Sequence, residues 1–387
     1  MSGRVRVKLW VSALVLGSAL AGAPAPSVAG LVPGGQHTGR VWASITAGGE
    51  HSCGIQRDES LWCWGTNGFG QLGNGGTENE WLPTRVDNGA WLQVDASDGA
   101  HTCGVHVDGS LWCWGNNDSG QLGTGDYDDR LAPTLIEVAA RWTAVSTGHG
   151  HTCAIQTNGS LWCWGLNNGG QLGIGSDAYL VPDPTEVAVG SRWLSVSVGG
   201  YFTCGVQPDH SLWCWGSGYA GELGLGDRTN RDEPVQVGSH VDWLEVSAGY
   251  TFTCGVRQAH TLWCWGHNFS GELGVGDRTD RYVPTQLVGD FWDNVSNGGS
   301  HACALSTDGA LFCWGEGHKG RLGYGGVTDQ LTPLRVGTRS DWSLLATGGV
   351  HSCAIRTSHG LLCWGSNLRG QLGVGKGISR ALYPTVV

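Results

Sequence analysis

Fourteen cysteines are the residues of this chain whose type and spacing most directly imply chemistry. They form seven Cys-x9-Cys pairs, and the first members of successive pairs lie 49 to 51 residues apart. The pairs are Cys53 with Cys63, Cys103 with Cys113, Cys153 with Cys163, Cys204 with Cys214, Cys254 with Cys264, Cys303 with Cys313, and Cys353 with Cys363. An even count with none left over indicates a disulfide framework, with free buried thiols as the alternative. Zinc is disfavoured because structural zinc sites usually pair cysteines two to four residues apart.

A predicted β-hairpin lies between the two cysteines of each pair. Asp108-Gly109, Asn158-Gly159 and Asp308-Gly309 are tight-turn signals between short apolar runs. Such a turn places the cysteines on facing strands, where cross-strand Cβ atoms are about 4.5–5.5 Å apart, within a modest adjustment of disulfide geometry. We therefore predict seven disulfides, one within each hairpin, each contributing roughly 2–3 kcal/mol in the chain-entropy model.

Histidine also has a fixed place, two positions before the first cysteine of a pair. Five units carry it, and Phe202 and Phe252 replace it in the other two. The five are His51, His101, His151, His301 and His351. A ring of histidines around an axis could bind a metal ion, but phenylalanine at two of the seven places favours a packing role. The acidic stretch Asp126 to Asp129 is a candidate for Ca²⁺, although its spacing does not match an EF-hand loop. We expect no metal and no cofactor.

Tryptophan is the third residue type with a repeated place. Seven tryptophans open the units, seven precede a glycine after the second cysteine, and five precede that cysteine. The first two series are Trp42, Trp91, Trp142, Trp193, Trp243, Trp292 and Trp342, then Trp64, Trp114, Trp164, Trp215, Trp265, Trp314 and Trp364. Light absorption or a ligand cage is conceivable for so many indoles. A residue repeated in every unit favours packing between units.

The elements that must position these residues are short strands in a repeat of about 50 residues, a period typical of a repeat architecture. Apolar runs bounded by Gly, Asn and Pro indicate about four strands per unit, and no helical period appears. The sequence therefore predicts an all-β, seven-bladed β-propeller with four-stranded blades. The first unit begins at Trp42, and the chain ends with Pro384-Thr385-Val386-Val387. We expect this last strand to join the first three and complete one blade, which would remove a free sheet edge.

The N-terminus resembles a secretory signal. Arg4, Arg6 and Lys8 precede an apolar stretch from Leu9 to Leu20, and Ser27-Val28-Ala29 supplies small residues for cleavage. An uncleaved anchor is the alternative, but about 12 apolar residues are too few to span a bilayer comfortably. We expect a signal peptide at 1–29, a lead-in at 30–41 and a propeller at 42–387. The mature protein would then be secreted, or periplasmic within the cell envelope, with no membrane span.

Net charge limits the classes of partner. It is −11 for the whole chain, and loss of the signal with its three positive charges would make it −14. Nucleic-acid binding is disfavoured because it needs clustered Lys and Arg. We expect a monomer whose partner is a protein or a glycan.

The repeated unit resembles a known family. Its pattern is Gly-x-x-His-Thr-Cys-Ala-x-x-x-x-Gly-x-Leu-x-Cys-Trp-Gly-x-Asn-x-x-Gly-Gln-Leu-Gly, clearest at Gly99 to Gly123 and Gly148 to Gly173. This pattern resembles the RCC1 (regulator of chromosome condensation) repeat over residues 42 to 387. The resemblance implies a seven-bladed propeller, here in a secreted, disulfide-bearing member of bacterial type. The family includes a nuclear exchange factor for a small GTPase, a plant UV photoreceptor and a secreted inhibitor of a β-lactamase.

Function is sought where the repeat is broken, because catalysis needs an asymmetric constellation. Glu222, Glu272 and Arg321 replace the glutamine of Gly-Gln-Leu-Gly, and units four and five share polar loops at 227–231 and 277–281. We interpret those loops as surface salt bridges, with partner contact as the alternative. No nucleophile-elbow, zincin or phosphate-loop motif is present, so no catalytic residue is predicted. An enzyme with a site in the central channel, or an exchange-factor-like regulator, remains an alternative function.

The loop tips that follow Trp-Gly differ most between units, and variable loops on one rim are where partners bind. Their candidate partner-binding residues are Phe69, Tyr219, Phe269, Lys319 and Arg369. Large aromatics at turn tips either bind a partner or lie flat over neighbouring blades. We hypothesise a secreted, non-enzymatic propeller that presents this loop-lined face to a protein or a glycan.

Overall fold

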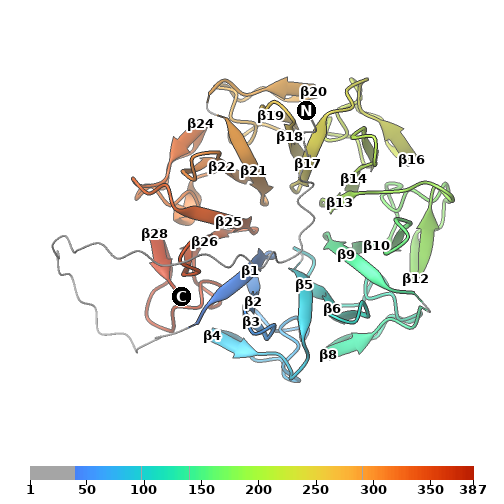
Figure 1. Ribbon diagram of the computed structural model, residues 1–387, viewed down its shortest axis with the longest axis horizontal. Helices are drawn as coiled ribbons and strands as arrows, with labels where there is room; N and C mark the ends of the chain where they lie inside the picture. The colour runs from blue at the N-terminus through green and yellow to red at the C-terminus, as the bar shows by residue number, and fades with distance from the viewer. Residues whose placement is uncertain (1–39, 97, 139, 290) are drawn as a thin grey trace, which may run out of the picture.

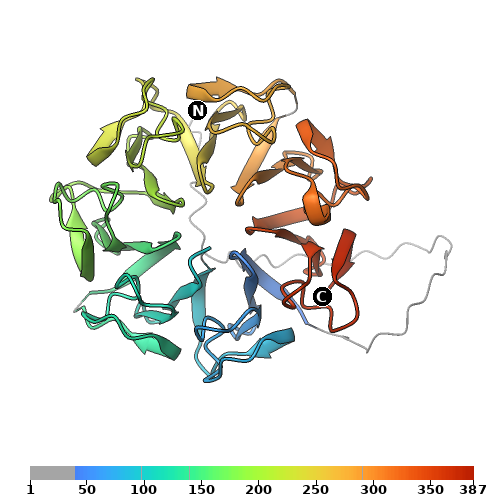
Figure 2. The same ribbon diagram turned by 180° about the vertical axis from the view of Figure 1, so that it is seen from behind.

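The computed structural model describes residues 40–96, 98–138, 140–289 and 291–387. The predicted signal peptide and most of the lead-in lie outside the described residues. Seven four-stranded antiparallel sheets surround a central axis, as Figure 1 and the reverse view in Figure 2 show. The predicted seven-bladed all-β propeller with four strands per blade is confirmed.

Each blade runs outward from the axis in chain order. The innermost strands are β1 (Trp42–Ala47), β5 (Trp91–Ala96), β9 (Trp142–Thr147), β13 (Ser195–Val198), β17 (Trp243–Ala248), β21 (Trp292–Asn297) and β25 (Trp342–Thr347). The second strands are β2 (His51–Gln56), β6 (His101–His106), β10 (His151–Gln156), β14 (Phe202–Val206), β18 (Phe252–Arg257), β22 (His301–Ser306) and β26 (His351–Arg356). The third strands are β3 (Leu61–Gly65), β7 (Leu111–Gly115), β11 (Leu161–Leu166), β15 (Leu212–Gly216), β19 (Leu262–Gly266), β23 (Leu311–Gly315) and β27 (Leu361–Ser366). The outer strands are β4 (Glu80–Arg85), β8 (Arg130–Leu135), β12 (Leu180–Val187), β16 (Arg231–Gln236), β20 (Arg281–Gln286), β24 (Gln330–Arg335) and β28 (Arg380–Val386). A short 3₁₀ helix, η1 (His318–Gly320), lies in the sixth unit.

The expected closure of one blade by the last strand is wrong. The sheets β1-β2-β3-β4 and β25-β26-β27-β28 are each built from consecutive strands. The first unit has its own outer strand at 80–85, so the Pro-Thr segment at the end of the chain is the outer strand of the seventh unit and pairs with β27. Local pairing within each unit therefore completes every blade. Contacts between blades 7 and 1 close the ring, among them a 3.0 Å bond from Gly349 N to Gly48 O.

All seven predicted disulfides are present, one within each β-hairpin of second and third strands. The two cysteines of a pair occupy directly opposed register positions, and their Cα atoms lie 4.1 Å apart in the first blade. The tight turn makes this register possible, and Gly109 adopts the left-handed φ of 83° that such a turn requires. The cysteines are buried, and those of the first blade pack in one apolar cluster with Trp91 and Trp114 of the next blade. The disulfides join Cys53 and Cys63, Cys103 and Cys113, Cys153 and Cys163, Cys204 and Cys214, Cys254 and Cys264, Cys303 and Cys313, and Cys353 and Cys363.

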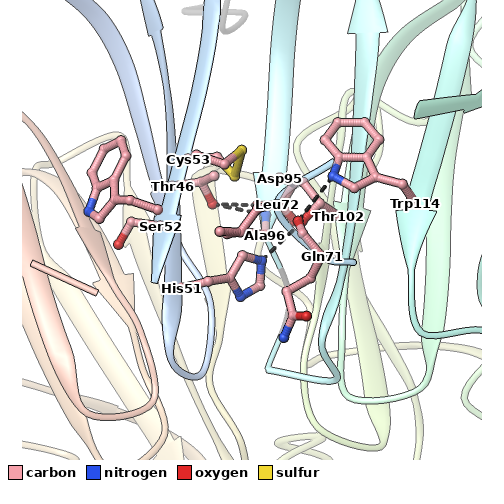
Figure 3. The surroundings of a disulfide bond; sticks show 12 residues. Thr46, His51, Ser52, Cys53, Gln71, Leu72, Asp95, Ala96, Thr102 and Trp114 are labelled. Atoms are coloured by element: carbon pink, nitrogen blue, oxygen red, sulfur yellow. Dashed lines mark hydrogen bonds between the residues drawn. A yellow bond between two sulfur atoms is a disulfide. The ribbon is translucent and has the colours of Figure 1, made fainter. Parts of the chain in front are cut away.

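Tryptophan packing between blades is confirmed. The Trp64 series is fully buried, and Trp114 Nε1 donates to the backbone oxygen of Gln71 in the preceding blade at 3.0 Å; Figure 3 shows this contact. Six of the seven indoles in this series make the equivalent bond. The tryptophans that open the units pack against them, with ring centroids 5.6 Å apart for Trp42 and Trp64. The Trp64 series thus buries apolar area, and in six of the seven blades it also ties the blade to the preceding one by a hydrogen bond.

The disc has two distinct faces. We call the loop face the side that carries the turns between first and second strands together with the long loops between third and fourth strands. The bond from Thr66 N to Glu50 O at 2.9 Å ties these two sets together. The hairpin face carries the disulfide hairpins and the connections between blades, which the bond from Trp91 N to Glu59 O joins at 2.9 Å. Within the described ranges, no helix has the length and hydrophobicity needed to cross a bilayer.

Candidate functional site

The central channel is lined by the innermost strands of all seven blades and contains a cavity of about 180 Å³. The fourth residue after each opening tryptophan faces the neighbouring inner strand. In six blades its side chain accepts a hydrogen bond from a backbone N–H of the next inner strand. The acceptors are Thr46, Asp95, Ser146, Ser197, Ser247 and Ser296, at 2.7 to 3.2 Å. Ala346 occupies this place in the seventh blade.

Asp95 is the one carboxylate among these seven equivalent positions. It accepts hydrogen bonds from Thr46 Oγ1 at 3.0 Å, from Thr147 N at 2.7 Å and from Thr147 Oγ1 at 3.0 Å. Figure 3 shows the Thr46 contact. Burial raises the pKa of Asp95 to about 6, although these donors oppose the shift. Asp95 therefore places a negative charge in the channel wall at neutral pH.

Glycines form the channel mouth on the loop face, where the turns between first and second strands meet. These turns begin with Gly-Gly in four of the seven units. A Cβ at Gly148 would lie 2.3 Å from Gly199 O, and one at Gly348 would lie 2.2 Å from Gly48 O. Neighbouring turns approach too closely for side chains at those places, so glycine is required there.

The remaining turns depart from Gly-Gly, and their side chains gather at the mouth. Asp98 replaces the first glycine of its turn, while His149 and Tyr250 replace the second. All three line the cavity, and Tyr201 packs beside them. Ring centroids lie 5.4 Å apart for His149 and Tyr201, 5.7 Å for His149 and Tyr250, and 6.0 Å for Tyr201 and Tyr250. We call Asp98, His149, Tyr201 and Tyr250 the mouth cluster.

The environment of the mouth cluster shifts its ionisable groups. Loss of hydration raises the pKa of Asp98, while the neighbouring His149 opposes that shift. Burial, followed by a hydrogen bond with Tyr201, raises the pKa of Tyr250 to about 12. The Asp98 carboxylate leans over Gly49 and Gly349, because a Cβ at those glycines would lie 2.4 and 2.9 Å from its Oδ1. The cluster thus spans the mouth, with a carboxylate over blades 1 and 7 and aromatic rings from blades 3, 4 and 5.

Sequence reasoning missed the mouth cluster, although it searched for breaks in the repeat. The signal in the sequence is the loss of a glycine from these turns. Asp98 stands where the other six units have their first glycine, and His149 and Tyr250 stand where the other five have their second. The four residues of the cluster come from four different units, so a search within single motifs does not connect them. The ring geometry brings them together.

The predicted tips all lie on the loop face, but the structure distributes them around its rim. Phe69, Tyr219 and Phe269 are 43%, 69% and 72% exposed, so neighbouring blades leave the last two largely uncovered. Lys319 is half-buried in η1 with φ 63°, and Arg369 is exposed, 3.9 Å from Glu50. The tips of blades 4 and 5 lie on the same two blades as Tyr201 and Tyr250.

The glutamine of Gly-Gln-Leu-Gly holds the tip backbone, and its glutamate replacements keep that role. Gln71 Oε1 accepts from Phe69 N at 3.0 Å, and Glu222 Oε2 accepts from Ala220 N at 2.6 Å. Glu272 likewise accepts from Ser270 N at 2.8 Å and lies 3.5 Å from His267, whose pKa it raises. Arg321 instead pairs with Glu316 at 2.8 Å and donates to Gly349 O at 3.1 Å. The residues that replace the glutamine therefore hold the backbone of the loop face, so we assign them a structural role.

The polar loops of units four and five contain the expected salt bridges. Arg231 pairs with Asp227 at 2.7 Å, and Arg281 pairs with Asp277 at 2.6 Å. In the same loops, Arg228 donates to the backbone oxygen of Tyr219, and Arg278 donates to that of Phe269. Arg228 and Arg278 therefore hold the aromatic tips in place.

The repeated histidines bond to the next blade. His51 Nε2 lies 3.0 Å from Thr102 Oγ1, which donates to Gln71 O at 2.8 Å (Figure 3). Burial lowers the pKa of His51 to about 4 and those of His101, His151 and His351 to about 3. These rings are neutral at pH 7 and act in packing. Over the described ranges, no group of three or more His, Cys, Asp or Glu is placed to hold a metal ion. In the acidic stretch, Asp126 pairs with Arg130 and Asp129 accepts from Asn117 N at 2.8 Å.

Two sequence models of the regulator of chromosome condensation (RCC1) repeat match the chain. One matches residues 58–103, 108–155, 158–206, 209–256, 260–305 and 308–355. The other matches residues 42–71, 91–121, 142–171, 243–272, 292–321 and 342–371. Together they span well over half of the sequence. No curated protein sequence matches the chain.

Several solved structures share the fold. Human WBSCR16 is 23% identical over 82% of this chain and 87% of that one, with a TM-score of 0.74. Prp20p from Saccharomyces cerevisiae, described with its binding to Gsp1p and histones, is 20% identical over 80% of each chain, with a TM-score of 0.72. The ectodomain of the Physcomitrella patens receptor kinase CR4 is 19% identical over 84% of this chain and 74% of that one, with a TM-score of 0.53. At these identities the likeness is one of fold alone.

Proposed function

The chain belongs to the RCC1 repeat family, and we propose that it is a secreted, non-enzymatic β-propeller whose loop face binds a partner protein, with a glycan as the alternative ligand. The observation that carries the proposal is the pair of exposed aromatic tips that the neighbouring blades 4 and 5 present on the loop face. Tyr219 and Phe269 are 69% and 72% exposed at turn tips, and arginines of their own loops fix the backbone beneath them. Rigid exposed aromatics are the residues that most often anchor protein interfaces.

The precedent of similar folds favours a protein partner. Prp20p is described with its binding to Gsp1p and histones. That likeness is of fold, so those two partners are not transferred to this chain. The units keep a spacing of 49 to 51 residues, which leaves no room for the inserted wedge of the family's exchange factor. A binding propeller therefore explains the sequence better than an exchange factor.

An oxidising compartment supports the secreted part of the proposal. Seven buried disulfides, one per blade, fit an extracellular or periplasmic protein because cytosolic thiols are kept reduced. One structure of similar fold is the ectodomain of a receptor kinase. We propose a signal peptide at 1–29, a lead-in at 30–41, and a monomeric propeller at 42–387.

The test compares two triple variants of the oxidised mature protein. The tip variant combines Phe69→Ala, Tyr219→Ala and Phe269→Ala, which removes the aromatic tips of the loop face. Its matched control combines Val189→Ala, Val288→Ala and Phe291→Ala, three residues of the hairpin face that are 82%, 97% and 67% exposed. Both variants should keep the wild-type melting temperature, because the substituted side chains lie at the surface.

Immobilised wild type, tip variant and control are exposed to envelope and medium fractions of the source cells, and to a glycan array. We expect a protein that wild type and control retain and the tip variant loses. Loss by the hairpin-face control alone would place the binding surface on the opposite face and reject the proposal. Retention of a glycan in place of a protein would select the alternative ligand.

A further inference from the structure

We propose that the mouth cluster is a binding site for the ammonium or guanidinium group of a lysine or arginine side chain, which a protein seated on the loop face inserts into the channel. The inference rests on the proposed function and adds the chemistry of the contact. It is drawn from the shape of the mouth, its charge, its aromatic rings and its position beside the exposed tips.

The shape of the mouth suits one side chain. The cavity of about 180 Å³ opens among turns that are mostly Gly-Gly. Glycine has no side chain, so Asp98, His149 and Tyr250 supply the large side chains at this end of the channel. A protein cavity of about 150 Å³ is known to admit a molecule of the size of benzene. The channel mouth therefore has room for the head group of one side chain that enters from the loop face.

The charge of the site is negative. Its lining includes Asp95 and Asp98 and contains no Lys or Arg. Two arginines of the loop face are already engaged: Arg321 pairs with Glu316 and donates to Gly349 O, and Arg369 lies 3.9 Å from Glu50. The ionisable neighbours of Asp98 are His149 and Glu50, and neither is a lysine or an arginine. Asp98 is exposed at the mouth, so its carboxylate is accessible to a cation that enters from the loop face.

The aromatic side of the mouth suits the same group. Tyr201 and Tyr250 meet edge to face, with an interplanar angle of 76°, and His149 and Tyr250 meet at 87°. Both tyrosines are partly exposed, and a cation within about 6 Å of an aromatic face is attracted by its quadrupole. His149 Nδ1 is buried and has no hydrogen-bond partner among the described residues. In the neutral tautomer protonated at Nε2, this nitrogen can accept an N–H from the ligand.

The position of the mouth favours a side chain from a docked protein over a free amine. Tyr201 and Tyr250 belong to blades 4 and 5, whose tips carry the most exposed predicted aromatics, Tyr219 and Phe269. The bond from Ser217 N to Tyr201 O at 2.9 Å links the mouth turn of blade 4 directly to its tip loop. A partner that covers these tips therefore lies next to the channel mouth.

The test titrates the mature oxidised protein with small probes of matched shape. N-acetyl-arginine methylamide carries the cation, and N-acetyl-citrulline methylamide is its neutral isostere. N-acetyl-lysine methylamide tests the ammonium form, and spermidine tests a free amine. Ligand-observed NMR or calorimetry measures each affinity. We expect the arginine or lysine probe to bind at least tenfold more tightly than citrulline.

Variants locate the site. Asp98→Asn keeps size and polarity, and should weaken the cationic probe at least tenfold without changing the melting temperature. Tyr250→Phe should retain binding because the ring remains, whereas Tyr250→Ala should lose it. Glu137→Gln removes an exposed carboxylate from the hairpin side and should have no effect. Equal affinity for arginine and citrulline probes, or full binding by Asp98→Asn, would overturn the proposal.

Failure of this inference is distinguishable from failure of the proposed function. The tip variant should still bind the cationic probe, because Phe69, Tyr219 and Phe269 do not line the cavity. Conversely, Asp98→Asn should weaken a captured protein partner while all tips are intact. Spermidine binding more than a hundredfold tighter than either amino-acid probe would assign the site to a free amine and reject the docked side chain.

Discussion

Blades 4 and 5 differ from the other five blades at the same structural positions. Phenylalanine replaces histidine at 202 and 252, and glutamate replaces glutamine at 222 and 272. The same two blades supply Tyr201 and Tyr250 to the channel mouth and Tyr219 and Phe269 to the exposed tips. Blades 4 and 5 therefore depart from the repeat both in their buried contacts with neighbouring blades and in the residues that they add to the proposed binding surface.

The difference has a physical basis in the contacts between blades. In blades 1, 2, 3, 6 and 7 a buried histidine bonds to a Thr or Ser hydroxyl of the next blade. Between blades 5 and 6, Phe252 replaces the histidine and Ala302 replaces the hydroxyl, so both polar partners are absent together. The buried pair at that seam is wholly apolar, which avoids an unsatisfied donor or acceptor.

Lowering the pH should have the largest effect, because five blades contain the buried histidine and blades 4 and 5 do not. Burial lowers the pKa of the repeated histidines, to about 3 for His101, His151 and His351. Unfolded histidine titrates near pH 6.5, so the unfolded state takes up the protons first and stability falls as pH drops from about 6.5 towards the folded values. Each group contributes up to about 1.4 kcal/mol per pH unit in that window, so five contribute up to about 7 kcal/mol per pH unit. Denaturant midpoints measured between about pH 7 and pH 5 should fall steeply.

Two variants test how strongly unfolding free energy depends on pH. The first combines His101→Phe with Thr152→Ala and so copies the apolar pair of Phe252 and Ala302. The control is His318→Phe, at an exposed position. The first should reduce the slope by about one fifth, and the second should leave it unchanged. Asp95 acts in the opposite sense: its pKa is raised to about 6, so its protonation in the folded state adds stability as pH falls from about 6 to about 4. Asp95 is one group against five, and a flat profile would contradict the neutral-histidine account.

Removing a disulfide should lower the free energy of unfolding by the same amount in blades 4 and 5 as in the other blades. One double variant replaces Cys153 and Cys163 of blade 3 by alanine, and the other replaces Cys254 and Cys264 of blade 5. Both open loops of equal length, with a sequence separation of 10 in each. Each should lose about 2–3 kcal/mol of unfolding free energy, measured by urea unfolding. A difference above about 1 kcal/mol would show that the disulfides, as well as the histidines, distinguish the two regions.

Phe252→His tests whether blade 5 depends on its apolar pair. The new imidazole would face Ala302, which has no hydroxyl, so a buried nitrogen would lack a partner at a cost of about 1–3 kcal/mol. Ala302→Ser should restore most of that loss in the double variant, since its hydroxyl can bond both the imidazole and Glu272 O. Thr253 already makes the equivalent bond to Glu222 O at 2.7 Å. Absence of this coupling in a double-mutant cycle would mean that the histidine contacts are incidental.

The sequence predicts the features that recur in every unit, and it misses the one cluster that forms only when the ring brings different units together. Blade number, strands, disulfide pairing and tryptophan packing follow from local patterns within each unit. The predicted closure of the first blade is wrong because it assigns the Pro-Thr strand to the start of the next unit, although Pro83-Thr84 already completes unit one. The mouth cluster comes from residues 98, 149, 201 and 250, which lie in four successive units. Their proximity depends on the curvature of the whole ring.

The smallest expected effect lies at the seam between the inner strands of blades 7 and 1, where Ala346 takes the place of the side-chain acceptors found at the other six seams. Ala346 of blade 7 has no hydroxyl to accept from Ala47 N in blade 1, whereas the equivalent residues of the other six blades each accept from the next inner strand. Ala346→Ser should complete the series and add about 0.5–1.5 kcal/mol, measured as a raised urea midpoint. Ser296→Ala is the matched loss at the neighbouring seam, where Ser296 Oγ accepts from Thr347 N at 3.1 Å. If Ala346→Ser gains nothing while Ser296→Ala loses about 1 kcal/mol, the seam between blades 7 and 1 is already satisfied by its glycine and histidine contacts. Equal and opposite effects would instead show that the seven seams are equivalent, so that blades 4 and 5 differ from the others in their surface and histidine layers alone.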